Sequence, residues 1–258
     1  MGRRQENKKN NFKKVVLIFL IAVFVLGALY LGYSFYNTRN KDNKENKNIL
    51  ESIVINEPEI TDTRTKRMLQ LEKLQEENNE IIGYLEIEGT NISYPVVQTN
   101  DNDFYLTHNY KKENATGGAL FLDKDFDMIN GSSNYLIYGH RMPDGTMFED
   151  LIKYSDEKFY KEHTKIKFTT NNEDCVYEIL AVFYSRVYYK SEKDVFRYYF
   201  FVNASNEAEY NDFVNNAKKA SIYDTGVNAE YGEQLLTLST CEYSREDGRF
   251  AIVAKKIK

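Results

Sequence analysis

Residues 234–257 read QLLTLSTCEYSREDGRFAIVAKKI, two runs of strand-forming residues joined by a short polar connection. Side chains alternate between the two faces of a strand, which places Cys241 on the same face as the polar Thr237 and Ser239. If the two runs pair as an antiparallel hairpin, Arg249, at the start of the second run, lies at the same end of the sheet as Cys241. A thiol and a guanidinium are therefore expected to be neighbours at the edge of a sheet.

Strand-forming runs, split by Gly, Asn and Asp turns, occupy most of the chain from Ile81 onward. Their composition and uneven spacing predict eight strands and favour a β-barrel or a sandwich. The predicted strands are Gly83–Glu88, Asn91–Val97, Ala119–Leu122, Asn134–Tyr138, Lys165–Thr169, Cys175–Tyr184, Gln234–Cys241 and Phe250–Ile257. The fold class is thus predicted to be mainly β with added helices.

Helical stretches are expected to interrupt these strands. The predicted helices are Asp101–Thr107, Thr146–Tyr154, Asp156–His163 and Ser205–Ala220. In the longest of them, Ser205 is the candidate N-cap. The apolar spacing of Leu71 and Leu74 predicts a further helix over Thr61–Glu80, which is expected to pack onto the domain.

The segment from Val15 to Tyr36 contains 22 residues and no charge. At about 1.5 Å per residue, a helix of this length spans the roughly 30 Å hydrocarbon core of a bilayer. A cleaved signal peptide is the alternative, but the apolar run is longer than the roughly 7–15 residues of such a peptide, and no small-residue cleavage site follows it. We therefore expect an uncleaved transmembrane helix.

The distribution of charge sets the expected orientation of this anchor. Residues 1–36 hold 6 of the 34 Lys and Arg and 1 of the 39 Asp and Glu, so residues 37–258 carry a net charge of −10. Basic flanks favour the cytoplasmic side, and an acidic domain argues against nucleic-acid binding. We expect a cytoplasmic tail over residues 1–14, the anchor over residues 15–36, a polar stalk over residues 37–60 and an extracellular domain over residues 61–258.

The candidate chemistry rests on three residues of complementary type. Cys241 ends one predicted strand, Arg249 begins the next, and His140 follows the predicted strand that ends at Tyr138. A thiol, an imidazole and a guanidinium supply the nucleophile, the proton carrier and the oxyanion-binding cation of acyl transfer. Taken singly, each has a plainer interpretation, namely an inert thiol, a surface histidine and an edge arginine. Their combination predicts nucleophilic catalysis.

The chain contains two cysteines and three histidines. Cys175 opens an apolar run and is expected to lie in the core, although a disulfide with Cys241 is an alternative in an oxidising compartment. The histidines are far apart in sequence, and no metal-binding motif occurs. We therefore expect neither a metal ion nor another cofactor.

Several motifs lie between Ile81 and Lys258. They are TLSTC at residues 237–241 with the spaced arginine, YGHRM at residues 138–142, YPVVQ at residues 94–98, DFYL at residues 103–106 and ALFLD at residues 119–123. In these motifs the chain resembles a class B sortase, and the N-terminal anchor fits that family. The resemblance implies an eight-stranded sortase β-barrel with an N-terminal helix and a long helix before the seventh strand.

The resemblance also implies a site and an activity. The family's catalytic residues fall on His140, Cys241 and Arg249. The implied peptide groove is lined by Asn102, Leu106, Phe196, Ser239 and Glu242, although Glu242 could instead face solvent. Such an enzyme cleaves a C-terminal sorting signal of the Asn-Pro-x-Thr or a related type after its Thr and holds the protein as a thioester. It then passes the protein to an amine of peptidoglycan or of its lipid-linked precursor, so surface proteins with this signal are the expected partners.

Two other functions remain open at the level of sequence. A secreted cysteine peptidase would use the same thiol and imidazole but would let water resolve the acyl-enzyme. In a papain-like peptidase the cysteine precedes the histidine, whereas here His140 precedes Cys241 by 101 residues. A membrane-anchored wall-binding module without chemistry would instead leave Cys241 unreactive or bonded to Cys175.

Overall fold

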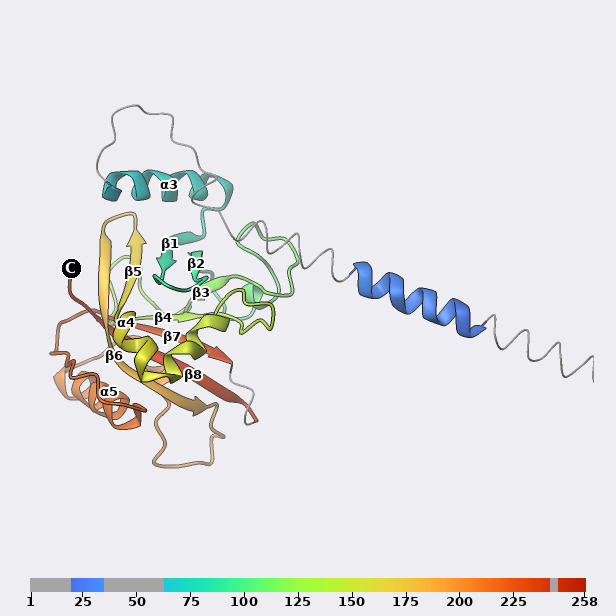
Figure 1. Ribbon diagram of the computed structural model, residues 1–258. Coiled ribbons are helices and arrows are strands. Elements are labelled where there is room, and N and C mark those ends of the chain that lie inside the picture. Colours follow the sequence, from blue (N-terminus) through green and yellow to red (C-terminus); the bar gives the residue numbers. More distant parts are fainter. Residues whose placement is uncertain (1–19, 35–62, 242–245) are drawn as a thin grey trace, which may run out of the picture. The chain divides into compact units, whose positions relative to one another are not determined.

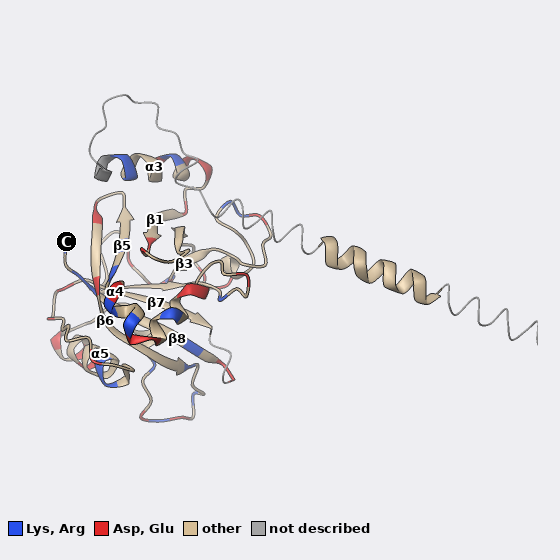
Figure 2. Cartoon of the chain, in the orientation of Figure 1, with Lys and Arg blue, Asp and Glu red and all other residues tan. Residues whose placement is uncertain are grey.

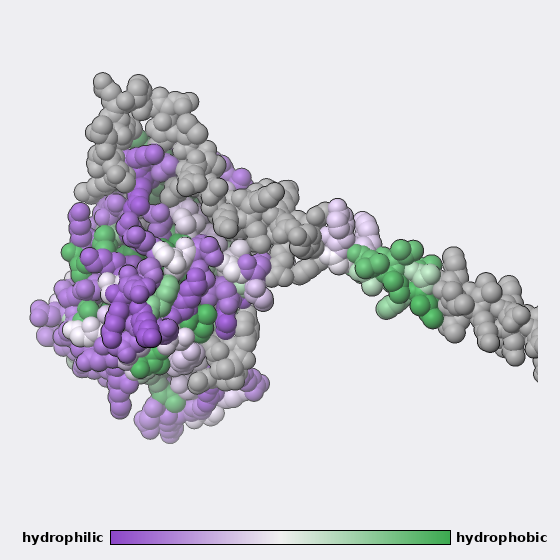
Figure 3. Space-filling view, viewed as in Figure 1, coloured by the Kyte–Doolittle hydropathy of each residue, from purple (hydrophilic) through white to green (hydrophobic). Residues whose placement is uncertain are grey.

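The computed structural model describes residues 20–34, 63–241 and 246–258 of the chain (Figure 1). The chain divides into two compact units, Met1–Asn48 and Ile49–Lys258. In the first unit, residues 20–34 form a helix that carries no charged residue and exposes its large apolar side chains (Figure 2, Figure 3). Within the three described ranges, no helix has both the length and the apolar character needed to cross a membrane.

The spanning helix over residues 15–36 stays a prediction, because residues 15–19 and 35–36 lie outside the described ranges. The predicted cytoplasmic tail over residues 1–14 and the stalk over residues 37–60 lie outside them as well.

Among the described residues of the second unit, eight strands close into a barrel (Figure 1). In chain order they are β1 Ile81–Glu86, β2 Ser93–Val97, β3 Leu120–Leu122, β4 Asn134–Tyr138, β5 Lys165–Thr170, β6 Asp174–Arg186, β7 Leu235–Cys241 and β8 Gly248–Lys256. Around the barrel the order is β1, β2, β3, β4, β7, β8, β6 and β5. The pairs β2–β3 and β4–β7 are parallel, and the other neighbours are antiparallel. The prediction of an eight-stranded barrel is confirmed.

Strand β7 is buried along nearly its whole length. Its leucines belong to the main apolar core. Of the polar side chains, Thr237 Oγ1 donates a hydrogen bond to Asn134 Oδ1 at 2.9 Å, and Ser239 Oγ, on the same face, lies 2.7 Å from the hydroxyl oxygen of Tyr198. The buried polar side chains of this face are thus paired, as the cost of burying an unpaired polar group requires.

Helices pack against the barrel and fill its connections. Helix α3, Thr63–Glu77, contacts β1, β5 and β6, and its Leu71 and Leu74 share a second apolar cluster with residues of β1. Helix α5, Glu207–Ala220, lies against β6 and precedes β7, so both helices occupy the expected places. The remaining helical elements are α4 Glu157–Glu162 and the 3-10 helices η1 Phe104–Leu106, η2 Glu149–Ser155 and η3 Tyr198–Phe200. The helices predicted over Asp101–Thr107 and Thr146–Tyr154 are therefore 3-10 turns with shifted bounds.

The start of α5 differs from the sequence expectation. Asn206, rather than Ser205, is the N-cap, and its side-chain oxygen accepts a hydrogen bond from Glu209 N at 3.1 Å. The Glu209 carboxylate in turn accepts a bond from Ser205 N at 2.8 Å. The first bond satisfies a backbone donor that the first helical turn leaves free, and the second ties the residue before the N-cap to that turn, which explains why the helix begins at Glu207.

The bond between Thr237 and Asn134 joins β7 to its parallel neighbour β4, and both residues are fully buried. Thr237→Val keeps the shape of the side chain but leaves the side-chain oxygen of Asn134 without its donor. We expect this substitution to lower the free energy of unfolding by about 1–3 kcal/mol, measured by urea denaturation. The exposed Thr116 provides the control, since Thr116→Val is expected to leave stability nearly unchanged. Equal stability of the Thr237→Val protein and the unmodified protein would contradict the assigned role of this bond.

Candidate active site

The parallel pairing of β4 with β7 brings the candidate histidine and cysteine together. Tyr138, the last residue of β4, lies opposite Ser239 in β7. The register between two parallel strands stays constant along their length. His140 lies two residues after Tyr138 and Cys241 two residues after Ser239, so the two are expected to lie opposite each other. The pairing continues past the end of β4, since Gly139 N donates a hydrogen bond to Ser239 O at 3.2 Å.

Strand β8 supplies the third candidate residue. In the antiparallel pair β7–β8, Arg249 lies directly opposite Cys241, so the hairpin expected from the sequence is present. His140, Cys241 and Arg249 line one cavity of about 270 Å³. The other lining residues are Asn102, Leu106, Phe121, Tyr138, Gly139, Val187, Tyr199, Ser239 and Thr240.

The imidazole of His140 is held from both sides. Its Nε2 lies 2.8 Å from the carbonyl oxygen of Leu106, in the connection between β2 and β3. A carbonyl can only accept, so Nε2 carries a proton and Nδ1 is left for the hydrogen bond with the Cys241 thiol. The backbone carbonyl thus sets the tautomer and the orientation of the ring.

The charge states of this pair are coupled. The hydrogen bond to Cys241 raises the pKa of His140 above its ordinary value, against the opposing effect of burial. The bond to His140 lowers the pKa of the Cys241 thiol, also against burial, and the charge of Arg249 lowers it further. Both shifts favour the thiolate–imidazolium pair, so more of the protein holds this pair near neutral pH than unperturbed groups would allow.

The guanidinium of Arg249 is positioned by its own turn. Its Nη1 donates hydrogen bonds to Gly248 O at 2.9 Å and to Asp247 O at 3.4 Å. Neutral carbonyls fix the group without cancelling its charge, and the planar guanidinium carries further donors on Nε and Nη2. It can therefore bind an oxyanion that forms beside the thiol.

Three of the five residues expected to line a peptide groove are found at the cavity. Asn102, Leu106 and Ser239 do line the cavity. Phe196 packs instead among aromatic rings of the core, because the loop before η3 turns its side chain inward; its ring partners are Phe183, Tyr198 and Phe213. Glu242 lies outside the described residues.

Sequence reasoning missed several lining residues. Tyr138 belongs to the same YGH motif as His140, and its place at a strand end was a usable signal. Val187 and Tyr199 come from the connection between β6 and α5, which carries no local pattern that points toward the site. Their position follows from the closure of the barrel, which is not a local property of the chain.

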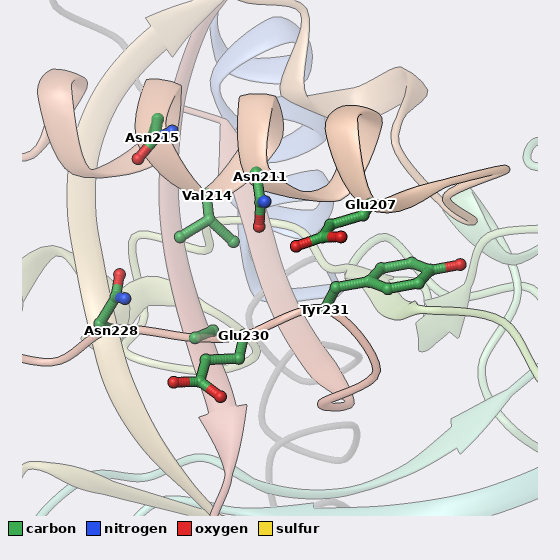
Figure 4. A pocket seen from close by; sticks show the side chains of 8 residues that line it. Glu207, Asn211, Val214, Asn215, Asn228, Glu230 and Tyr231 are labelled. Atoms are coloured by element: carbon green, nitrogen blue, oxygen red, sulfur yellow. The ribbon is translucent and has the colours of Figure 1, made fainter.

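A second hollow, of about 520 Å³, lies between α5 and the segment that precedes β7 (Figure 4). Asn211 and Glu207 approach it from the helix, and Glu230 and Tyr231 from the opposite segment. Among the described residues that line it, none carries a thiol, an imidazole or a guanidinium. The chemistry of acyl transfer is therefore assigned to the smaller cavity at the other end of β7.

Both cysteines are free thiols. Cys175 is buried at the start of β6, and burial is the main cause that raises the pKa of its thiol to about 11. Cys241 is only partly buried and has a lowered pKa. The disulfide left open by the sequence does not form. The raised thiol pKa of Cys175 is that of a structural cysteine, and the lowered thiol pKa of Cys241 is that of a reactive one.

Known proteins resemble this chain over most of its length. A family model for the sortase domain matches residues 85–257. Sortase B of Listeria monocytogenes is 31% identical over 253 residues, covering 96% of this chain and 98% of the relative. Sortase B of Staphylococcus aureus is 34% identical over 191 residues, covering 73% and 75%. The crystal structure of sortase B from Bacillus anthracis in complex with AAEK1 aligns with a TM-score of 0.70 at 32% identity, over 86% of this chain and 99% of that chain.

The family match runs from within β1 to beyond the end of β8, so it includes the last two residues of β1 and all of the other seven strands of the barrel. The fold and the matched domain define a cysteine transpeptidase. The chain belongs to the sortase family, and its relatives place it in class B.

The coupled pair predicts how thiol reactivity depends on pH. In a Cys175→Ala background, we expect alkylation of Cys241 by a small reagent to rise with a midpoint below the ordinary thiol value of 9.0, because His140 lowers the pKa. His140→Ala removes the hydrogen bond and its charge, and is expected to move the midpoint upward. The measurement is the alkylation rate between about pH 5 and pH 10, a window that covers the ordinary His and Cys values. An unchanged midpoint in His140→Ala would show that the imidazole does not tune the thiol.

Proposed function

We propose that this sortase cleaves a C-terminal sorting signal of the Asn-Pro-x-Thr or a related type after its Thr and transfers the protein to an amine of the cell wall. The observation that carries the proposal is the convergence of His140, Cys241 and Arg249 on one cavity through the registers of β4, β7 and β8. One relative, sortase B of Staphylococcus aureus, has been solved as a substrate complex, with a TM-score of 0.71 at 26% identity.

In the first half-reaction, the Cys241 thiolate adds to the carbonyl carbon of the Thr residue. Negative charge moves to the carbonyl oxygen, where the Arg249 guanidinium stabilises it. As the tetrahedral intermediate collapses, the C–N bond breaks, and the departing amine takes a proton from His140 Nδ1. The acyl group is left as a thioester on Cys241.

In the second half-reaction, an incoming amine attacks the thioester carbonyl. His140, now neutral, accepts the proton of that amine at Nδ1, and Arg249 again binds the oxyanion. The C–S bond breaks, the new amide is released, and Cys241 returns to the thiolate beside a protonated His140. The same three side chains catalyse both half-reactions, because His140 regains in the second the proton that it gave up in the first.

The proposed acyl donor occupies the cavity lined by Asn102, Leu106 and Ser239. These residues offer an amide, an apolar surface and a hydroxyl, a combination suited to an extended peptide. Glu242 stays a sequence prediction for this groove. The proposed acceptor is peptidoglycan or its lipid-linked precursor, and the proposed location is the outer face of the cell membrane, anchored through residues 15–36. The uncharged sequence of that segment and its basic flank support the location.

Loss of the nucleophile tests the proposal directly. The full chain in detergent is mixed with a panel of quenched fluorogenic peptides of the Asn-Pro-x-Thr and related types, with an added amine, and the products are weighed by mass spectrometry. We expect Cys241→Ala to abolish turnover, since the thioester cannot form. Cys175→Ala is the matched control and is expected to retain most activity, because that thiol is buried away from the cavity. Full activity in a folded Cys241→Ala protein would disprove the mechanism, and hydrolysis without amine transfer would favour a peptidase.

Arg249→Lys separates charge from geometry. The substitution keeps a positive charge beside the thiol but loses the planar fork of donors. We expect kcat to fall on the order of 10²–10³-fold, as for loss of an oxyanion donor. Alkylation of Cys241 by a small reagent is expected to change much less, because it forms no oxyanion. If both rates fell together, Arg249 would act through thiol ionisation rather than through the oxyanion.

A further inference from the structure

Asp123 lies behind the wall of the cavity that contains Cys241. It follows β3 directly and is only 4% exposed. Its Oδ2 accepts hydrogen bonds from Asn102 Nδ2 at 3.0 Å and from the Tyr138 hydroxyl at 3.1 Å, and its Oδ1 accepts one from Asp125 N at 2.9 Å. Asn102 and Tyr138 both line the cavity, so one buried carboxylate holds two parts of its wall.

A buried carboxylate is a costly means of stabilising a fold, because the charge loses its hydration. The three donors that Asp123 receives are neutral. The adjacent Lys124 forms its contact ion pair with the exposed Asp125, and its charge acts on Asp123 only as a smaller, more distant interaction. Hydrogen bonds to an ionised acceptor are stronger and more directional than those to a neutral one. The charge of Asp123 therefore serves to hold its two cavity-lining partners in fixed orientations.

The side chain of Asn102 is fixed at both ends. Its Oδ1 accepts a hydrogen bond from Lys124 N at 2.9 Å, while its Nδ2 donates to Asp123. A backbone N–H can only donate and a carboxylate can only accept, so these bonds set which end of the amide is which. The second hydrogen of Nδ2 is then presented by a residue that lines the cavity, and it suits a peptide carbonyl oxygen.

The ring of Tyr138 is fixed by the same carboxylate. Burial raises the pKa of its hydroxyl, and the charge of Asp123 and the bond to it raise the pKa further. The phenol therefore keeps its proton and continues to donate to Asp123. Its ring packs against Phe121 at a centroid distance of 5.3 Å, and both rings line the cavity.

We infer that Asp123 is a positioning residue, which orients Asn102 and Tyr138 so that the cavity binds the backbone of the peptide acyl donor beside Cys241. This inference rests on the proposed function, in which the cavity receives that peptide. Asp123 itself touches no reacting atom, so its effect must pass through these two neighbours.

The first test separates binding from chemistry. Asp123→Asn removes the charge at nearly constant volume. We expect kcat/KM for a sorting peptide to fall about tenfold, mainly through KM, with alkylation of Cys241 unchanged within about twofold. Asp125→Asn, which removes an exposed carboxylate two residues away, is the matched control and is expected to leave KM unchanged. A fall in kcat at constant KM, or no change at all, would overturn the inference.

A coupling experiment excludes a merely structural role. In a protein that already carries Asn102→Ala and Tyr138→Phe, the groups through which Asp123 acts are absent. Asp123→Asn is then expected to lower kcat/KM by less than about twofold, because the effects of coupled residues are not additive. A further loss of about tenfold in this background would show that Asp123 acts through the fold as a whole.

A measurement without substrate distinguishes this inference from the proposed function. The side-chain NH₂ signals of Asn102 are assigned in NMR spectra by their loss in Asn102→Ala. We expect them to exchange with water at least about tenfold faster in Asp123→Asn than in the unmodified protein or in Asp125→Asn. Equal exchange rates would overturn the positioning role. Faster exchange, combined with an unmodified protein that is inactive on every sorting peptide, would support the positioning role and overturn the proposed function.

Discussion

The parallel register of β4 against β7 is the constraint on which the active site depends. Because Tyr138 is opposite Ser239, the residues two positions further along, His140 and Cys241, lie side by side. A slip of one residue would move the imidazole away from the thiol and turn the face of β7 that carries the thiol. The hydrogen bond between Thr237 on β7 and Asn134 on β4 fixes this alignment. Because this bond is buried, water cannot replace it.

The site combines charges of opposite sign without cancelling them. Two cationic groups stabilise the thiolate of Cys241, namely the titratable imidazolium of His140 and the permanently charged guanidinium of Arg249. The carboxylate of Asp123 accepts its side-chain hydrogen bonds from the neutral Asn102 and Tyr138. The carboxylate of Asp123 thus lies behind the cavity wall, and in the proposed mechanism the two cationic groups face the substrate oxygen that becomes negative.

The sequence predicts the strands well because apolar alternation and turn residues report directly on local strand formation, as in β7 and β8. The choice of a barrel over a sandwich followed from the resemblance to a family. The same alternation, with the short hairpin, predicts that Cys241 and Arg249 meet. Contacts between distant segments are not encoded in this way. The carbonyl of Leu106 has no side-chain signature, and the inward packing of Phe196 depends on how a long connection folds over the barrel. The N-cap of α5 was misplaced by one residue because Ser and Asn are both good caps, and the choice depends on the position of Glu209.

The carbonyl oxygen of Leu106 occupies Nε2 of His140 and leaves the ring a single nitrogen for exchange with substrates. In the proposed mechanism the departing and the entering amine must therefore approach the same nitrogen, on the same side of the thioester. The two amines cannot be present together, so the first product has to leave before the acceptor binds. The thioester on Cys241 makes a ping-pong order of substrates possible, and one backbone atom in the connection between β2 and β3 would then enforce that order.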